Sequence, residues 1–306
     1  MFDLQGHRGA RALWPENTLA GFARTLELGV STVELDCAVT RDGIVVVSHD
    51  PRLNAEHTRD AQGRFIEVAG APIWSLSFAE LQQFDVGRIR PGSALAAAFP
   101  QQQPVDGERI PRLADVLKLV YERGRAQVRV NIEVKIFPEQ PALTMAPEPF
   151  VQLLKRDIAA TGSAAIVNIQ SFDWRVLQAV QRQMPGQSTA ALTDQQPGED
   201  TIQVGSARPS PWLGGLNPAD YNNSVPRLVQ AIGAGTWAPE YRDLSAARVA
   251  EAHALGLRVV PWTVNESADM ANLLAQGVDG IITDQPDRLR ALLIQQGRAV
   301  PVAPQA

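Results

Sequence analysis

The stretch NTLAGFARTLELGVSTVELD, from Asn17 to Asp36, decides the fold because it joins a helix pattern to a strand pattern through one glycine. Asn17 is predicted to cap the start of the helix, and Gly29 to take the left-handed position that ends it. The apolar residues between them follow helical spacing, at Leu19, Phe22, Ala23 and Leu26. The strand STVELD then follows and ends in charged side chains. This is one helix-strand unit of a parallel sheet.

The same unit recurs along the chain. Clear copies cover residues 110–135, 244–265 and 266–284, and weaker ones cover 150–172 and 173–194. The strands are predicted at 4–7, 32–39, 128–135, 165–170, 188–193, 235–238, 257–264 and 279–283. About eight such strands predict an α/β fold of the closed (β/α)8 TIM-barrel type. The alternative is an open doubly wound sheet, but no glycine-rich G-x-G-x-x-G turn follows the first strand.

The repeating pattern lapses between Pro51 and about Ile110, after the second barrel strand. We expect one barrel domain over residues 1–306, with an inserted subdomain or lid over residues 51–110. A short helix is predicted from Phe78 to Phe84, and the aromatic residues Trp74, Phe78 and Phe84 are expected to form a small core of their own. A second irregular stretch, residues 197–227, is expected to cover the barrel mouth.

Composition excludes several classes of protein. The net charge is -5, with both signs scattered along the chain, which argues against a nucleic-acid partner. No apolar run is long enough for stable membrane insertion. The single cysteine, Cys37, excludes an internal disulfide and favours a reducing compartment. As written, the chain is expected to be cytoplasmic, or periplasmic if a leader was removed. The oligomeric state is left open.

Carboxylates gather where predicted strands end. Glu34 and Asp36 alternate on one strand, and Glu133 and Lys135 on the next, so each pair projects to one face. At the carboxyl ends of barrel strands, three carboxylates would suit a hard divalent cation, Mg²⁺ or Ca²⁺. The sequence offers no cysteine or histidine cluster for structural zinc. The simpler alternative for each pair is an ion pair at a strand end.

Two of the four histidines directly follow short apolar runs. His7 and His49 are predicted to act as a proton donor and acceptor, because an imidazole titrates near neutral pH. The alternative for either is a core histidine with a satisfied ring. His57 lies in the inserted segment and His253 in a helical stripe, so neither is assigned to the site.

Other residues at the predicted strand ends could bind substrate. Arg8 and Lys135 are expected to bind an oxyanion, although Arg8 could instead pair with Glu16 or Asp36. Phe172 and Trp262 are candidates for an apolar wall, or for ordinary packing. Asp284, in contrast, is predicted only to cap the final helix.

The ordered blocks of sequence resemble the glycerophosphodiester phosphodiesterase family over about Gln5 to Leu292. The blocks are HRGA and PENT (residues 7–18), VELDCAVTRDGIVVVSHD (33–50), IEVK (132–135), VPWTVN (260–265) and GVDGIITDQP (277–286). The resemblance implies a (β/α)8 barrel with a small insertion. It implies that one divalent cation is bound by Glu34, Asp36 and Glu133, that His7 and His49 are acid and base, and that Arg8 and Lys135 contact phosphate.

The implied reaction hydrolyses an sn-glycerol-3-phosphodiester, such as glycerophosphocholine or glycerophosphoethanolamine, to glycerol 3-phosphate and an alcohol. By similarity, a glycerol hydroxyl could attack first and water then open a cyclic intermediate. Residues 49–63 follow the family pattern only loosely, which leaves the preferred alcohol open. Two alternative functions are also considered. One is a phospholipase D-like lyase on lysolipids, and the other is a non-catalytic barrel that binds a phosphorylated ligand.

Overall fold

The first helix-strand unit folds as its pattern predicts in the computed structural model, which describes residues 2–303. Helix α1 (Leu19–Leu28) leads into strand β2 (Thr32–Val39). The turn between them needs Gly29, whose φ is 85° and whose N–H bonds the carbonyl of Leu26. The predicted cap is wrong by one residue. The hydroxyl of Thr18 accepts the N–H of Gly21, and Asn17 instead turns its amide to the site described below.

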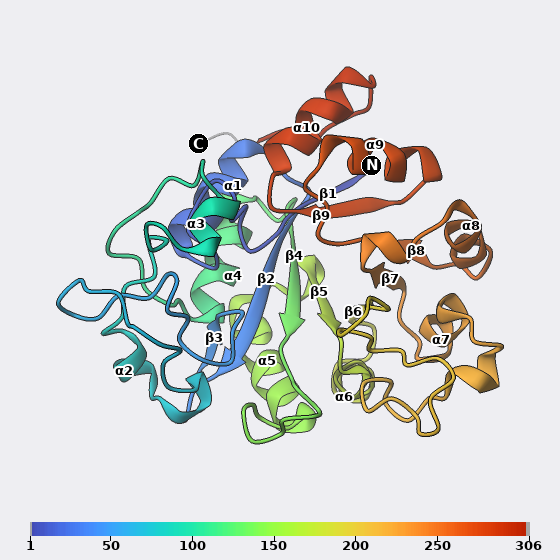
Figure 1. Ribbon diagram of the computed structural model, residues 1–306, viewed down its shortest axis with the longest axis horizontal. Helices are drawn as coiled ribbons and strands as arrows, with labels where there is room; N and C mark the ends of the chain where they lie inside the picture. The colour runs from blue at the N-terminus through green and yellow to red at the C-terminus, as the bar shows by residue number, and fades with distance from the viewer. Residues whose placement is uncertain (1, 304–306) are drawn as a thin grey trace.

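Eight parallel strands form a nearly closed barrel, which confirms the predicted fold (Figure 1). Their order is β8-β7-β6-β5-β4-β2-β1-β9. Besides β2, they are β1 (Asp3–Gly6), β4 (Arg129–Val134), β5 (Val167–Ser171), β6 (Ser188–Thr193), β7 (Thr236–Pro239), β8 (Arg258–Val259) and β9 (Gly280–Thr283). The two outer strands also meet, because Asp279 N–H bonds the Val259 carbonyl at 2.9 Å. Strand β8 is shorter than predicted, and Pro261, which lacks an N–H, follows it.

Helices surround the barrel and cover the outer faces of its strands (Figure 1). They are α4 (Leu113–Arg123), α5 (Pro147–Thr161), α6 (Trp174–Gln183), α7 (Val225–Ala231), α8 (Ala246–Ala254), α9 (Ser267–Gln276) and α10 (Pro286–Gln295). Short 3₁₀ turns lie at η2 (Ala164–Ile166), η3 (Pro218–Tyr221) and η4 (Tyr241–Asp243). The main core lies between strands and helices, where Leu113, Val116, Leu117 and Val120 of α4 are completely buried.

The segment after β2 departs from the repeating unit. Strand β3 (Val45–Val47) runs antiparallel to β2 and returns the chain toward the barrel mouth. The long stretch that follows contains η1 (Ile73–Ser75), α2 (Phe78–Leu81) and α3 (Ala94–Ala98). It has a small apolar cluster of its own, against which Phe78 and Phe84 pack, whereas Trp74 packs against the main core. Helix α2 ends three residues before the predicted end.

A column of polar side chains runs along the barrel axis. The Asn131 amide donates to the side-chain carbonyls of Gln5, at 3.0 Å, and Gln170, at 2.8 Å. Gln5 donates to Asp3 at 3.1 Å, and Gln170 donates to Glu34 at 3.1 Å. We call these five residues the polar column. Barrel interiors are more often filled by branched apolar side chains, so this column is a distinctive feature of the chain.

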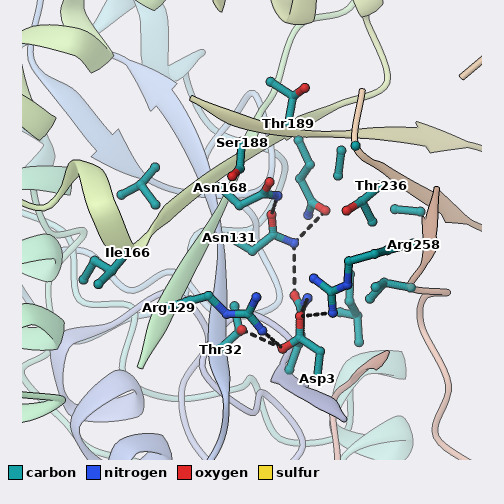
Figure 2. Close-up of a pocket in the computed structure, with 18 of the residues that line it drawn as sticks. Asp3, Thr32, Arg129, Asn131, Ile166, Asn168, Ser188, Thr189, Thr236 and Arg258 are labelled. Carbon is teal, nitrogen blue, oxygen red and sulfur yellow. Dashed lines mark hydrogen bonds and ion pairs between the residues drawn. The ribbon is translucent and has the colours of Figure 1, made fainter. Parts of the chain in front are cut away.

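Asp3 anchors the column at the amino ends of the strands, beside a cavity of about 250 Å³ (Figure 2). Its carboxylate accepts the Thr32 hydroxyl at 2.7 Å and pairs with Arg129 at 2.8 Å and Arg258 at 3.5 Å. Figure 2 shows the two arginines and Thr32 converging on Asp3. This cavity lies at the opposite end of the barrel from the strand ends that carry the predicted site, and the contacts of Asp3 join β1, β2, β4 and β8.

We expect Asp3→Ala to destabilise the protein by about 1–3 kcal/mol, because it leaves the buried donors of Thr32 and Gln5 unpaired where four strands meet. The measurement is the urea midpoint of unfolding. Glu27→Ala, on the exposed face of α1, is the matched control and should change the midpoint little. An unchanged midpoint for Asp3→Ala would show that Asp3 does not stabilise the barrel.

Candidate active site

Three carboxylates meet at the carboxyl ends of β2 and β4. Asp36 pairs in register with Glu133, and Glu34 lies two residues before Asp36 on the same face. One oxygen from each of the three groups lies within 4.8 Å of the others. All three side chains are buried, and Asp36 is completely so. Such a group of hard oxygen donors could hold a divalent cation.

Two cationic side chains partly balance these charges. Lys135 Nζ lies 2.6 Å from Glu133 and 3.2 Å from Asp36 Oδ1. Arg8 Nε lies 3.4 Å from Asp36, while the Arg8 guanidinium also bonds Glu16 at 3.0 Å. Both alternatives considered for Arg8, pairing with Glu16 and pairing with Asp36, are therefore observed. Arg8 also donates its backbone N–H to Glu34 at 2.9 Å.

The protonation of the triad reflects burial and crowding. Burial raises the pKa of Glu34 well above its ordinary value, and the charges of Asp36 and Glu133 add to the shift. Burial, opposed in part by Lys135, raises the pKa of Glu133 to about 7. For Asp36 burial acts in the same direction, but Lys135, His49 and Arg8 together hold its pKa well below the ordinary range. Three ionised carboxylates are therefore unfavourable together in this site unless a further positive charge lies among them.

A hard cation fits this environment. The buried Oδ1 of Asp36 has no hydrogen-bond partner among the described residues, although Lys135 lies nearby. Asp36 Oδ2, by contrast, accepts the Asn17 amide at 3.0 Å. A buried carboxylate oxygen without a donor, facing two other carboxylates, is the arrangement that a bound cation would satisfy.

His7, which follows β1, is held by a residue from the far end of the sequence. Its Nδ1 lies 2.5 Å from Asp284 Oδ1, and its Nε2 lies 3.9 Å from Glu34. Burial lowers the pKa of His7, against the opposing effect of Asp284. Since a carboxylate can only accept, Nδ1 carries the hydrogen and the Nε2 lone pair remains available on the neutral ring.

The predicted capping role of Asp284 is wrong. Gln285 occupies the N-cap of α10, with no side-chain cap bond, while Asp284 is completely buried. Its carboxylate accepts Arg11 Nε at 2.8 Å and the Asn265 amide at 2.8 Å, in addition to contacting His7. Because β9 lies beside β1, the residue after β9 is within reach of the residue after β1.

His49 lies at the same site but is positioned by a different kind of strand. It follows the antiparallel strand β3 rather than a barrel strand, and the Ser48 N–H bonds the Asp36 carbonyl at 2.9 Å. Its Nδ1 lies 3.0 Å from Asp50, whose other oxygen accepts the Asn54 amide at 2.7 Å. Burial lowers the pKa of His49 to about 4, assisted by Arg8 and Lys135.

Both histidines face one inner cavity of about 220 Å³. Of the predicted site residues, the cavity is lined by His7, Arg8, Glu34, His49, Glu133, Lys135, Phe172 and Trp262, while Asp36 lies outside the lining. Phe172 and Trp262 pack edge to face, with ring centroids 5.3 Å apart. Phe172 and Trp262 therefore line the cavity and also pack against each other.

A larger outer cavity, of about 450 Å³, adjoins the inner one and shares its residues His49, Glu133 and Lys135. Residues from the stretch 197–227, including Trp212, line it, as expected for a segment at the barrel mouth. The two unassigned histidines line neither cavity. His253 pairs with Asp279 at 3.0 Å, whereas His57, in the inserted segment, shares a smaller pocket with His49.

None of the helices within residues 2–303 combines the length and apolar character needed to cross a lipid bilayer.

Comparison with known proteins links the chain to one family of enzymes. The model of the Glycerophosphoryl diester phosphodiesterase family matches residues 7–288. A glycerophosphodiester phosphodiesterase from Caldanaerobacter subterraneus is 29% identical, covering 95% of this chain and 97% of the relative. A Silicibacter pomeroyi structure, provisionally named glycerophosphoryl diester phosphodiesterase, is 33% identical with a TM-score of 0.86, covering 98% and 95% of the two chains. An Oleispira antarctica phosphodiesterase, solved with its product sn-glycerol-3-phosphate, is 21% identical with a TM-score of 0.69, covering 95% and 96%.

Proposed function

The chain belongs to the glycerophosphoryl diester phosphodiesterase family, and from this premise we propose that it hydrolyses sn-glycerol-3-phosphodiesters to glycerol 3-phosphate and an alcohol. Glycerophosphocholine and glycerophosphoethanolamine are the proposed substrates. The observation that carries the proposal is that Glu34 and Glu133, two histidines and Lys135 line one cavity, with the carboxylate of Asp36 grouped beside those of Glu34 and Glu133. The product bound to the Oleispira antarctica relative adds support for a glycerol 3-phosphate site.

We propose that Glu34, Asp36 and Glu133 hold one divalent cation, Mg²⁺ or Ca²⁺. When bound, such a cation would withdraw electron density from the phosphoryl oxygens and so favour attack on phosphorus. Arg8 and Lys135 stay protonated in this site and would bind the remaining phosphate charge. Asn54 of the inserted segment 51–110 would hold His49 in place through Asp50, the residue just before that segment.

The two histidines divide the proton transfers between them. His7, neutral and hydrogen-bonded through Nδ1, presents Nε2 to accept a proton from the attacking hydroxyl. His49 lines both cavities, so in its protonated form it would donate to the oxygen of the leaving alcohol in the outer cavity. The negative phosphodiester would raise the pKa of His49 on binding and so favour that form. A new oxygen–phosphorus bond forms as the bond to the alcohol oxygen breaks.

The reaction is tested by incubating the protein with glycerophosphocholine and measuring glycerol 3-phosphate and choline. Phosphorus NMR would also detect a cyclic glycerol phosphate, if a glycerol hydroxyl attacks before water. Release of phosphocholine instead would place cleavage on the other side of phosphorus. Absence of turnover over a panel of sn-glycerol diesters, with either cation, would contradict the proposal, and conversion of lysophosphatidylcholine to a cyclic phosphate would favour the lyase.

We expect Asp284→Asn to lower kcat by about 10- to 150-fold, because His7 loses a charge-assisted hydrogen bond that fixes its tautomer. The carboxylate of Asp284 raises the pKa of His7. Its removal therefore lowers that pKa, and the acidic limb of the kcat/KM profile should move to lower pH. KM should change much less than kcat.

Asp287→Asn, in the exposed first turn of α10, is the control for that variant and should behave as wild type. If Asp284→Asn lost activity with no change in its pH profile, a general structural effect would explain the loss better than the positioning of His7.

A further inference from the structure

The outer cavity combines aromatic and acidic side chains at the place where the leaving alcohol would lie. Phe172 packs edge to face against Trp212 as well as Trp262, with centroids 6.4 Å and 5.3 Å apart. All three rings line the cavity. The same lining also carries carboxylates, from Glu139, Asp194, Glu199 and Asp200. Because the rings support one another, this aromatic wall is formed before any ligand binds.

Positive charge is scarce in this cavity. Among the described residues that line it, Lys135 is the one lysine or arginine, and it lies at the inner edge, 2.6 Å from Glu133. The neighbouring Arg242 bonds Glu240 at 2.8 Å and is not part of the lining. The outer cavity therefore has a negative potential, whereas the inner cavity presents Arg8 and Lys135 to an anion.

Asp194 is the most buried of these four carboxylates. Only 7% of its surface is exposed, and no cationic side chain of the described chain lies within ion-pairing distance of it. Its Oδ1 accepts the backbone N–H of Gln196 at 2.7 Å. Burial raises its pKa to about 6, with further contributions from Asp243, Glu240 and Glu199. A buried carboxylate without a cationic partner is unfavourable, and a cationic ligand would relieve this.

We propose that the outer cavity selects diesters whose leaving alcohol carries an ammonium group, through the carboxylate of Asp194 and the aromatic wall of Phe172, Trp212 and Trp262. This inference rests on the proposed function, because it places the glycerol phosphate in the inner cavity. A quaternary ammonium gains most from aromatic faces, whereas the carboxylates attract any ammonium. Neutral polyols such as glycerol or inositol would gain neither contribution, and an anionic alcohol would be repelled.

The test compares kcat/KM for glycerophosphocholine with that for glycerophosphoglycerol, whose leaving alcohol is neutral. We expect wild type to favour glycerophosphocholine by about tenfold or more, mainly through KM. Asp194→Asn keeps the oxygen that accepts from Gln196 but removes the charge, and should raise KM for glycerophosphocholine about tenfold while changing KM for glycerophosphoglycerol much less. Asp220→Asn, an exposed position outside the cavity lining, is the control.

A binding measurement makes the test independent of turnover. Choline chloride, added to wild type, is expected to change tryptophan fluorescence in a saturable way, and Asp194→Asn or Trp212→Leu should weaken this binding. Glu199→Gln, at an exposed position, serves if Asp194→Asn fails to fold.

The outcomes separate the two proposals. Equal kcat/KM for both diesters, unaltered by Asp194→Asn, would overturn the ammonium selection and leave the proposed function intact. Choline binding that requires Asp194, in a protein that cleaves no glycerophosphodiester, would support the cation site and overturn the proposed function. Absence of both turnover and choline binding would overturn both.

Discussion

Chelation of divalent cations is expected to abolish release of glycerol 3-phosphate, and Mg²⁺ or Ca²⁺ is expected to restore it. The physical reason is the triad Glu34, Asp36 and Glu133, three buried and crowded carboxylates whose oxygens would be ionised together only around a cation. Without that cation the phosphate would lose the positive charge that we propose to stabilise it. A loss of several kcal/mol of transition-state stabilisation corresponds to at least about 10³-fold in rate.

The triad itself should be tested with Glu34→Gln. We expect this variant to show a sharp fall in cation affinity, measured by calorimetry, and a sharp fall in kcat. Asp157→Asn is the matched control, since Asp157 is a buried acid of α5, 2.8 Å from Arg156 and away from the triad. Full activity in a chelator, or cation affinity that Glu34→Gln leaves unchanged, would contradict a metal site at these carboxylates.

Replacing His7 by alanine is expected to lower kcat by about 10²–10⁴-fold, because proton transfer in the transition state contributes that much. The same loss is expected for His49→Ala, since each histidine would serve one of the two proton transfers. The fold should persist in both variants, as judged by circular dichroism and thermal unfolding. The measurement is kcat at saturating glycerophosphocholine.

His253→Ala provides the control for these histidine variants, because His253 pairs with Asp279 outside both cavities. It should retain wild-type kcat. If either His7→Ala or His49→Ala kept near wild-type turnover, the division of proton transfer between two histidines would be wrong.

The barrel could be predicted from sequence because its repeating unit is local. The helical spacing before Gly29 and the strand after it are contained in one stretch, and copies of that unit imply parallel strands. Strand ends could then be compared, which identified Glu34, Asp36 and Glu133 together. Local pattern does not fix strand direction, however. The apolar run before His49 forms the antiparallel strand β3. The side chain of His49 still reaches the site because β3 returns beside β2.

Sequence analysis missed the contacts that Asp284 and Gln170 make in the site, because these contacts join segments that are distant in the sequence. Asp284 looked like a helix cap because an acid before Pro286 fits that local pattern. Only the pairing of β9 with β1 places its carboxylate against His7. The strand-end rule, applied to β9 as it was to the other strands, would have identified Asp284. Gln170 is the last residue of the strand predicted at 165–170, but its bond to Glu34 depends on the polar column within the closed barrel.

The contact between His7 and Asp284 spans 277 positions of sequence, which has a consequence for folding during synthesis. Strand β1 pairs with β9 as well as with β2. Since β9 is the last strand to be synthesised, β1 can complete its pairing only after synthesis has passed β9. Contacts of such long range slow folding and leave a strand edge exposed meanwhile. Because the same closure completes the His7–Asp284 pair, turnover should appear only when the barrel has closed, so enzyme activity can report the last step of folding.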